Sequence, residues 1–190
     1  PTQAAQAYLA GQAVAAAPGE RFNYNTAETN LVGDIVRSAT GGSLSGYLSR
    51  TIWQPFGMQA DANWELVRPE GAEYGGSSLN ATLRDYGRIG LFVLADGVLP
   101  DRTRALPIGW IDESTTAAPT NPHYGYQWWL GPGGTFQAQG IFGQAIYIDP
   151  ANEIVIALHS AWPVAAGEAY LAARDKLFAL ISEELKLRNE

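Results

Sequence analysis

Serine, lysine and histidine are the side chains through which this sequence could transfer an acyl group. A serine hydroxyl becomes an effective nucleophile beside a base, as in the motifs Ser-x-x-Lys and Gly-x-Ser-x-Gly. The chain has two lysines, Lys176 and Lys186, and three residues before them stand Ala173 and Glu183. No Ser-x-x-Lys is therefore present, and no serine of the chain fits Gly-x-Ser-x-Gly.

Other residues of the chain offer weaker candidates for chemistry. Ser77 and Ser78 lie in a glycine-rich segment and are the first serines to test as a nucleophile of the chain itself. His123 and His159 are the only histidines, and no second type of metal ligand clusters with either. Cysteine is absent, which excludes thiolate ligands and disulfides. We therefore expect neither a metal site nor a cofactor.

The first 120 residues are predicted to be mostly helical. Alanine-rich residues 2–17 favour a helix that Pro18-Gly19 ends. Asn30 is predicted to cap a helix that closes at Gly41-Gly42. The remaining predictions are a helix capped by Ser43 and ended by Pro55, a long loop over 59–78, a helix from the cap Asn80 to Leu94, and a short helix from Pro107 through Trp110.

The pattern changes at about residue 120. Short aromatic and apolar runs predict strands at 124–130, 135–139, 142–148 and 153–160, the last two joined in a hairpin by a turn at Asp149-Pro150-Ala151-Asn152. Residues 165–187 predict an amphipathic helix with Ala169, Ala173, Leu177, Leu180 and Ile181 on one face. A helical region over 1–120, followed over 121–190 by antiparallel strands and a covering helix, is α+β architecture within one compact unit.

Charge and hydropathy limit the possible partners. The 190 residues carry a net charge of -7, so we expect no nucleic-acid partner. No apolar run reaches the ~18 residues that a membrane span needs, and residues 1–11 lack a signal-peptide pattern. We therefore expect no membrane association from this chain.

Four segments, in the same order, resemble the serine β-lactamase-like hydrolases. This family includes class C β-lactamases, D-Ala-D-Ala carboxypeptidases, esterases and amidases. The 6-aminohexanoate-oligomer hydrolase and carboxylesterase-like members are the most similar. The segments are Phe22-Asn23-Tyr24-Asn25-Thr26, the run from Gly75-Gly76-Ser77-Ser78 to Arg84-Asp85-Tyr86, Gly125-Tyr126-Gln127-Trp128-Trp129, and Gly140-Ile141-Phe142-Gly143-Gln144.

The resemblance implies roles for individual residues. Tyr24 matches the family's catalytic tyrosine, which relays a proton; its ordinary pKa near 10 requires nearby cations for that role. Thr26 stands where the family has an asparagine that binds substrate. Gly143 matches the glycine of Lys-Thr-Gly, and Gln144 matches the next residue, whose backbone N–H is half of the oxyanion hole. Trp128 is a candidate for lining the acyl pocket, although an aromatic strand residue can equally be core.

Ile141 and Phe142 stand where the family has the lysine and threonine of its Lys-Thr-Gly motif. That lysine supplies positive charge where penicillins and D-alanyl peptides carry a carboxylate, and isoleucine cannot supply it. Esters and uncharged amides are therefore better substrate candidates than β-lactams.

The resemblance predicts a portion of a serine hydrolase that forms an acyl-enzyme, with the nucleophile and the first strands supplied from outside this chain. That supplier would be a missing N-terminal segment or a second copy. The chain alone would then be inactive, and the family occurs in the bacterial periplasm and cytoplasm. The alternative is a catalytically inactive scaffold used for binding or assembly. Without the first strands, the hairpin of 142–160 or its neighbours is expected to present an unpaired edge or an apolar face. Such a surface would recruit another chain, giving a dimer, a retained peptide or poor solubility.

Overall fold

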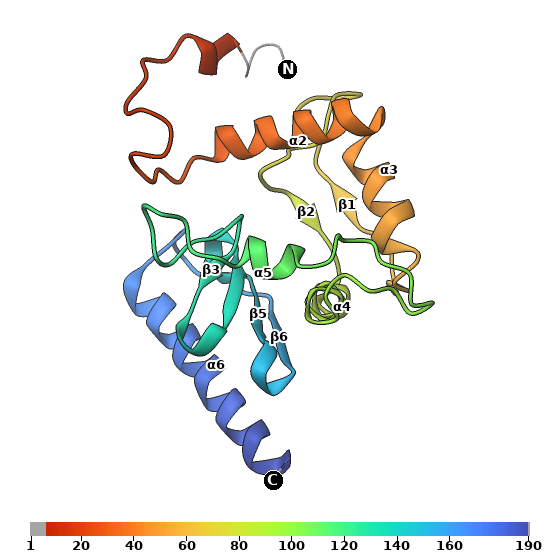
Figure 1. The fold of residues 1–190 in the computed structure, drawn as a ribbon, viewed down its shortest axis with the longest axis vertical. Helices are drawn as coiled ribbons and strands as arrows, with labels where there is room; N and C mark the ends of the chain where they lie inside the picture. Colours follow the sequence, from red (N-terminus) through yellow and green to blue (C-terminus); the bar gives the residue numbers. More distant parts are fainter. Residues whose placement is uncertain (1–6, 190) are drawn as a thin grey trace. The chain divides into compact units, whose positions relative to one another are not determined.

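The computed structural model describes residues 7–189, and the chain divides into two compact units, Pro1–Thr82 and Leu83–Glu190 (Figure 1). Each unit has its own secondary structure, helical in the first and mixed in the second. None of the described helices combines the length and the apolarity that crossing a membrane requires.

The first unit is built around α2 (Thr26–Thr40). Asn25 caps this helix, because its side chain accepts a hydrogen bond from the Ala27 N–H at 3.0 Å. Gly41 ends it in the left-handed conformation, with its N–H donating to the Arg37 carbonyl at 2.9 Å. The predicted end of this helix is confirmed. The predicted start is wrong, since Asn30 lies inside the helix, one turn after the true cap.

Two further helical segments and two short strands complete this unit. Ser43 caps α3 (Leu44–Leu48) by accepting the Gly46 N–H at 3.1 Å, as predicted. The helix continues through the π-helical turn η1 (Ser49–Trp53), shortly before Pro55. The strand β1 (Asn63–Trp64) pairs with β2 (Leu79–Asn80), so the predicted loop contains a strand and Asn80 is no helix cap.

The second unit centres on a four-stranded antiparallel sheet in the order β3-β4-β5-β6 (Figure 1). Its strands are β3 (Trp129–Leu130), β4 (Phe136–Gln139), β5 (Ala145–Asp149) and β6 (Ile154–Leu158). The predicted hairpin is confirmed: β5 and β6 are joined by the turn η4 (Pro150–Asn152). Among the described strands none pairs with the outer side of β6, which is an edge as expected.

Opposite faces of this sheet carry different helices. Side chains alternate along β5, so Ile146 and Tyr147 point to opposite faces. α4 (Leu83–Leu94) packs on the Ile146 face, where a Cβ atom at Gly90 would lie 3.0 Å from Ile146 Cγ2. α6 (Glu168–Asn189) packs on the other face, where the rings of Phe178 and Tyr147 lie 5.2 Å apart.

Several predicted boundaries in the two units differ from the structure. Residues 1–6 of the predicted N-terminal helix lie outside the described residues, and its remainder is helical only over 7–10. The short helix predicted from Pro107 is α5 (Trp110–Ser114). Most of the strand predicted at 124–130 is turn, because Gln127 has φ 66° and the chain bends back on itself there.

The face of α6 that packs on the sheet is not the predicted apolar face. Leu177 and Leu180 are exposed, whereas Arg174, Phe178 and Ser182, spaced four residues apart, are buried. The periodicity predicted the helix, but the stripe that meets the sheet is largely polar.

Candidate active site

Tyr24 lies directly before the helix α2 and is 57% exposed. The following residue, Asn25, caps the helix and also donates from its side-chain amide to the Glu28 carboxylate at 3.2 Å. These two bonds hold the Asn25 side chain in place at the start of the helix, one residue after Tyr24. Thr26 is the first residue of the helix, so both predicted residues of the tyrosine motif sit at a defined helix start.

The Gly75-Gly76 segment packs closely on the same helix. A Cβ atom at Gly75 would lie 2.9 Å from Gly33 Cα, and one at Gly76 would lie 3.0 Å from Thr26 Cγ2. The Gly76 N–H also donates to the Asn30 side-chain oxygen at 3.1 Å. The structure therefore brings the segment leading to Ser77 and Ser78 against the first turn of the helix that follows Tyr24.

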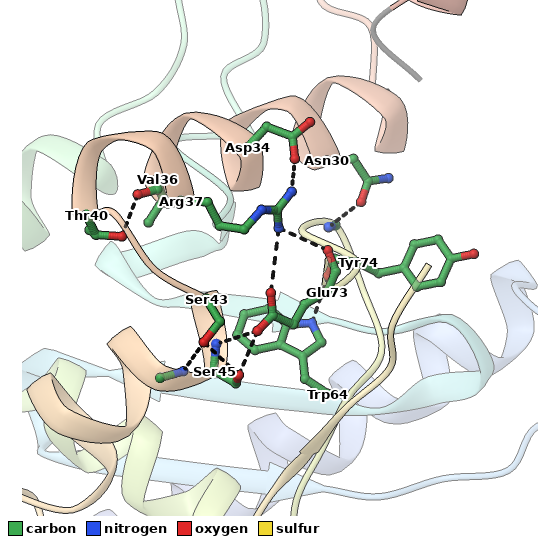
Figure 2. Close-up of polar contacts among 12 residues, drawn as sticks. Asn30, Asp34, Val36, Arg37, Thr40, Ser43, Ser45, Trp64, Glu73 and Tyr74 are labelled. Carbon is green, nitrogen blue, oxygen red and sulfur yellow. Dashed lines mark hydrogen bonds and ion pairs between the residues drawn. The ribbon is translucent and has the colours of Figure 1, made fainter. Parts of the chain in front are cut away.

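A buried carboxylate, Glu73, ties this segment to two helices (Figure 2). It accepts the Ser45 hydroxyl at 2.6 Å and the Ser45 N–H at 3.0 Å. Arg37 of α2 donates to the Glu73 carbonyl at 3.2 Å and forms ion pairs with Glu73 and Asp34. Burial alone would raise the pKa of Glu73, but the hydrogen bonds from Ser45 outweigh it and leave the pKa below its usual value.

The predicted oxyanion segment forms a tight turn rather than a strand. Ile141, Phe142 and Gly143 make up the turn η3 (Ile141–Gly143) between β4 and β5, with φ 63° at Phe142 and φ 97° at Gly143. The Phe142 N–H donates to the Ala165 carbonyl at 2.9 Å, and the Phe142 carbonyl accepts the Trp162 N–H at 3.1 Å. These two bonds clamp the turn onto the segment that leads into α6.

Two backbone donors of this turn remain available. The N–H groups of Ile141 and Gln144 have no hydrogen-bond partner among residues 7–189. The Gly143 N–H, in contrast, donates to the Gly140 carbonyl at 3.3 Å. Backbone N–H groups fixed in a rigid turn are the usual donors to an oxyanion. Gln144 was predicted for this role from the sequence; the availability of the Ile141 N–H was not.

A cavity of about 190 Å³ lies beside this turn, on the α4 face of the sheet. Gln144 lines it together with Tyr86 of α4, His159 after β6, and the apolar residues Ala138 and Ile146. The Gln144 side-chain oxygen is buried and has no partner within the described chain.

Tyr86 and His159 were not predicted as site residues. Their rings meet edge to face with centroids 5.3 Å apart, and burial raises the pKa of Tyr86. The phenol is therefore neutral at physiological pH. Sequence periodicity placed Tyr86 on a helix and His159 at a strand end, but only the packing of α4 on the sheet brings them together.

Trp128 packs edge to face against Phe136, with ring centroids 5.0 Å apart, and does not line the cavity. The predicted residues fall into both units. Tyr24, Thr26, Ser77 and Ser78 belong to the first unit, and Trp128 and residues 141–144 belong to the second. In residues 7–189, no three potential metal ligands gather into a group.

The fold is that of a β-lactamase-like hydrolase. The sequence profile of the Beta-lactamase family matches residues 1–180. The chain therefore belongs to the Beta-lactamase family.

Particular relatives carry the name of a 6-aminohexanoate-dimer hydrolase. The chain is 30% identical over 157 residues to 6-aminohexanoate-dimer hydrolase of Paenarthrobacter ureafaciens, covering 75% of this chain and 40% of that protein. A Bacillus anthracis structure that carries the same name superposes with a TM-score of 0.82 at 28% identity, over 96% of this chain and 49% of that one. The chain thus spans about half the length of these relatives.

A more distant structure supports the fold alone. A β-lactamase from Mycobacterium bovis superposes with a TM-score of 0.67 at 18% identity, covering 88% of this chain and 67% of that one. The α+β architecture predicted from the sequence is confirmed by these neighbours.

Proposed function

We propose that this chain forms part of a serine hydrolase that cleaves amide or ester bonds through an acyl-enzyme, with the nucleophile supplied from outside residues 1–190. The observation that carries the proposal is the turn at residues 141–144, which is clamped in place and leaves the N–H groups of Ile141 and Gln144 unpaired among the described residues. Membership of the Beta-lactamase family supports the same chemistry.

Each step of the proposed reaction has a candidate residue. The serine oxygen attacks the carbonyl carbon, and its proton passes through the lysine of the outside segment and the Tyr24 phenol to the leaving nitrogen or oxygen. The Gln144 N–H holds the carbonyl oxygen as it becomes negative, and water then releases the acid by the reverse proton route. The family resemblance assigns substrate positioning to Thr26 and to Gly143, whereas Trp128 packs against Phe136 and does not line the cavity beside Gln144.

The substrate class follows from the charges around the turn. Ile141 is 68% exposed and Phe142 is 39% exposed, and neither carries a charge. A substrate carboxylate placed beside them would meet no cation and would lose hydration without compensation. Small neutral esters and uncharged linear amides therefore suit the site.

The alternative is a catalytically inactive scaffold used for binding or assembly. Labelling of the native protein with a fluorophosphonate, followed by peptide mapping, separates the two. The proposal predicts a labelled serine in a Ser-x-x-Lys sequence outside residues 1–190. Labelling of Ser77 or Ser78 would place the nucleophile in this chain, and an unlabelled protein would support the scaffold.

A further inference from the structure

A second cavity, of about 570 Å³, lies on the opposite face of the sheet, between α6 and the strands β3 to β5. It is lined by side chains that the proposed reaction does not use. Gln137 and Tyr147 point into it from neighbouring strands, where they are paired in register. Phe178 and Ser182, one turn apart on α6, line it from the helix.

Two residues that line the cavity, Gln137 and Ser182, each carry a buried oxygen atom without a partner in the described chain. The Ser182 hydroxyl oxygen belongs to a residue that is only 4% exposed, and the Gln137 side-chain oxygen is buried as well. Buried polar atoms are nearly always hydrogen-bonded, so each orphan is costly unless a bound molecule or water satisfies it. Both atoms can accept a hydrogen bond, and the glutamine oxygen can only accept.

The charges around this cavity favour a cation. Asp149 is 2% exposed, accepts the Asn152 side-chain N–H at 2.7 Å and lies 3.7 Å from the Lys186 ammonium. Asp175 and Glu183 line the cavity as well. Asp175 is ion-paired with Arg174 at 3.0 Å, so the three carboxylates outnumber the two nearby cations, Lys186 and Arg174, by one. An anion would meet net negative charge there, whereas a cation would be attracted.

The remaining walls are aromatic and apolar. The rings of Tyr147 and Phe178 lie 5.2 Å apart on one side, and Trp129 lines another part of the cavity. Aromatic faces attract ammonium groups and also bury alkyl chains.

From these observations we propose that this cavity is a binding site for a primary alkylammonium compound. The ammonium group, with three N–H donors and no acceptor, donates to Gln137 Oε1 and Ser182 Oγ, and its alkyl chain lies against Tyr147 and Phe178. This site is separate from the Gln144 cavity on the other sheet face and does not depend on the proposed hydrolase activity.

The test is a titration of the 190-residue chain with n-butylammonium, n-butanol and butyrate, followed by calorimetry and by NMR of the Gln137 side-chain amide. We expect n-butylammonium to bind with a dissociation constant on the order of 1 mM and to shift the Gln137 signals. Butanol and butyrate should bind at least about tenfold more weakly, because one offers a single donor and the other carries the wrong charge.

Two variants locate the site. Ser182→Ala and Gln137→Met should each weaken n-butylammonium binding about tenfold, while leaving the chain folded, because each removes a buried group that has no protein partner. Ser114→Ala is the matched control: Ser114 is equally buried, but its hydroxyl donates to the Ile111 carbonyl and it does not line the cavity. Equal binding of all three compounds, no binding by any of them, or unchanged binding in both variants would overturn the proposal and leave water as the partner of the two oxygens.

Discussion

The indole of Trp162 lies directly against the backbone of Gly143, so that a Cβ atom at Gly143 would come within 2.3 Å of Trp162 Cε2. Trp162 in turn stacks on Tyr170, with ring centroids 5.4 Å apart, and the Arg174 guanidinium lies 5.9 Å from the Trp162 ring centroid. The turn that carries the candidate oxyanion donors therefore packs against Trp162, which precedes α6, and Trp162 in turn packs against Tyr170 and Arg174 of α6.

Gly143→Ala should destabilise the chain by about 2–4 kcal/mol, because the new methyl group meets Trp162 and the residue has φ 97°. Urea unfolding measures the effect. Gly133→Ala is the matched control, since Gly133 has φ 67° with nothing within 4 Å of a new Cβ atom. Gly133→Ala should lower the free energy of unfolding by only about 1 kcal/mol, which is the cost of holding an alanine in the left-handed conformation.

A double-mutant cycle identifies the contact responsible. If the new methyl group meets the Trp162 ring, combining Gly143→Ala with Trp162→Ala should cost about 1–3 kcal/mol less than the sum of the two single changes. Additive effects would show that backbone conformation alone accounts for the loss.

Glu73→Gln should lower the stability of the chain at pH 7 by about 2 kcal/mol, because it removes the charge that Ser45 and Arg37 stabilise. The folded-state pKa of Glu73 lies below the unfolded value of about 4.3, so its contribution is complete above that pH. The contribution is lost as the pH falls through the lower, folded-state pKa.

Urea unfolding between neutral pH and pH 3 measures this linkage. Glu73→Gln should flatten the acid side of the stability curve, whereas Glu70→Gln, on an exposed residue of the same segment, should leave it unchanged. A wild-type curve as flat as that of Glu73→Gln would contradict the assigned role of Glu73.

If Tyr24 relays the proton as proposed, Tyr24→Phe should lower kcat of the native hydrolase about 10²- to 10⁴-fold, because it removes the hydroxyl while keeping the ring. Stability should change little, since the ring is 57% exposed. Hydrolysis of a p-nitrophenyl ester measures the rate. Tyr47→Phe, on a residue that is 39% exposed, is the control and should retain full activity.

Ile141→Lys should shift substrate preference toward anionic esters by about tenfold in kcat/KM, because it places a cation at an exposed position of the turn. The ratio of kcat/KM for an ester with a free carboxylate to that for its methylated form measures this. Ile141→Gln is the control, because it introduces a long polar side chain without a charge. An equal change of the kcat/KM ratio in Ile141→Gln would show that the charge is not the cause.

Local signals in the sequence predicted much of the fold. Ser43, Gly41 and the turn Asp149-Pro150-Ala151-Asn152 each determine a cap or a turn within a few residues, and all three predictions are confirmed. The start of α2 was missed because asparagine is a competent cap at both position 25 and position 30. The structure uses Asn25, which accepts the Ala27 N–H, whereas the Asn30 side chain bonds the Gly76 N–H instead.

The features that the sequence did not predict depend on contacts between residues that are far apart in the chain. Leu177 and Leu180 have helical spacing, as Arg174, Phe178 and Ser182 do, and periodicity could not tell which stripe meets the sheet. Similarly, Tyr86 and His159 are 73 residues apart in sequence, and their ring contact exists only because α4 packs beside the end of β6. The candidate residues came from sequence motifs, whereas the cavity beside Gln144 required the structure.

The most direct test is a crystal structure of the complete hydrolase with a phosphonate bound covalently to its serine. The proposed function predicts that the phosphonyl oxygen accepts the Gln144 N–H and that the Tyr24 hydroxyl lies within hydrogen-bond distance of the serine oxygen. A phosphonyl oxygen held entirely by groups other than residues 141–144, with Tyr24 remote from the adduct, would contradict it.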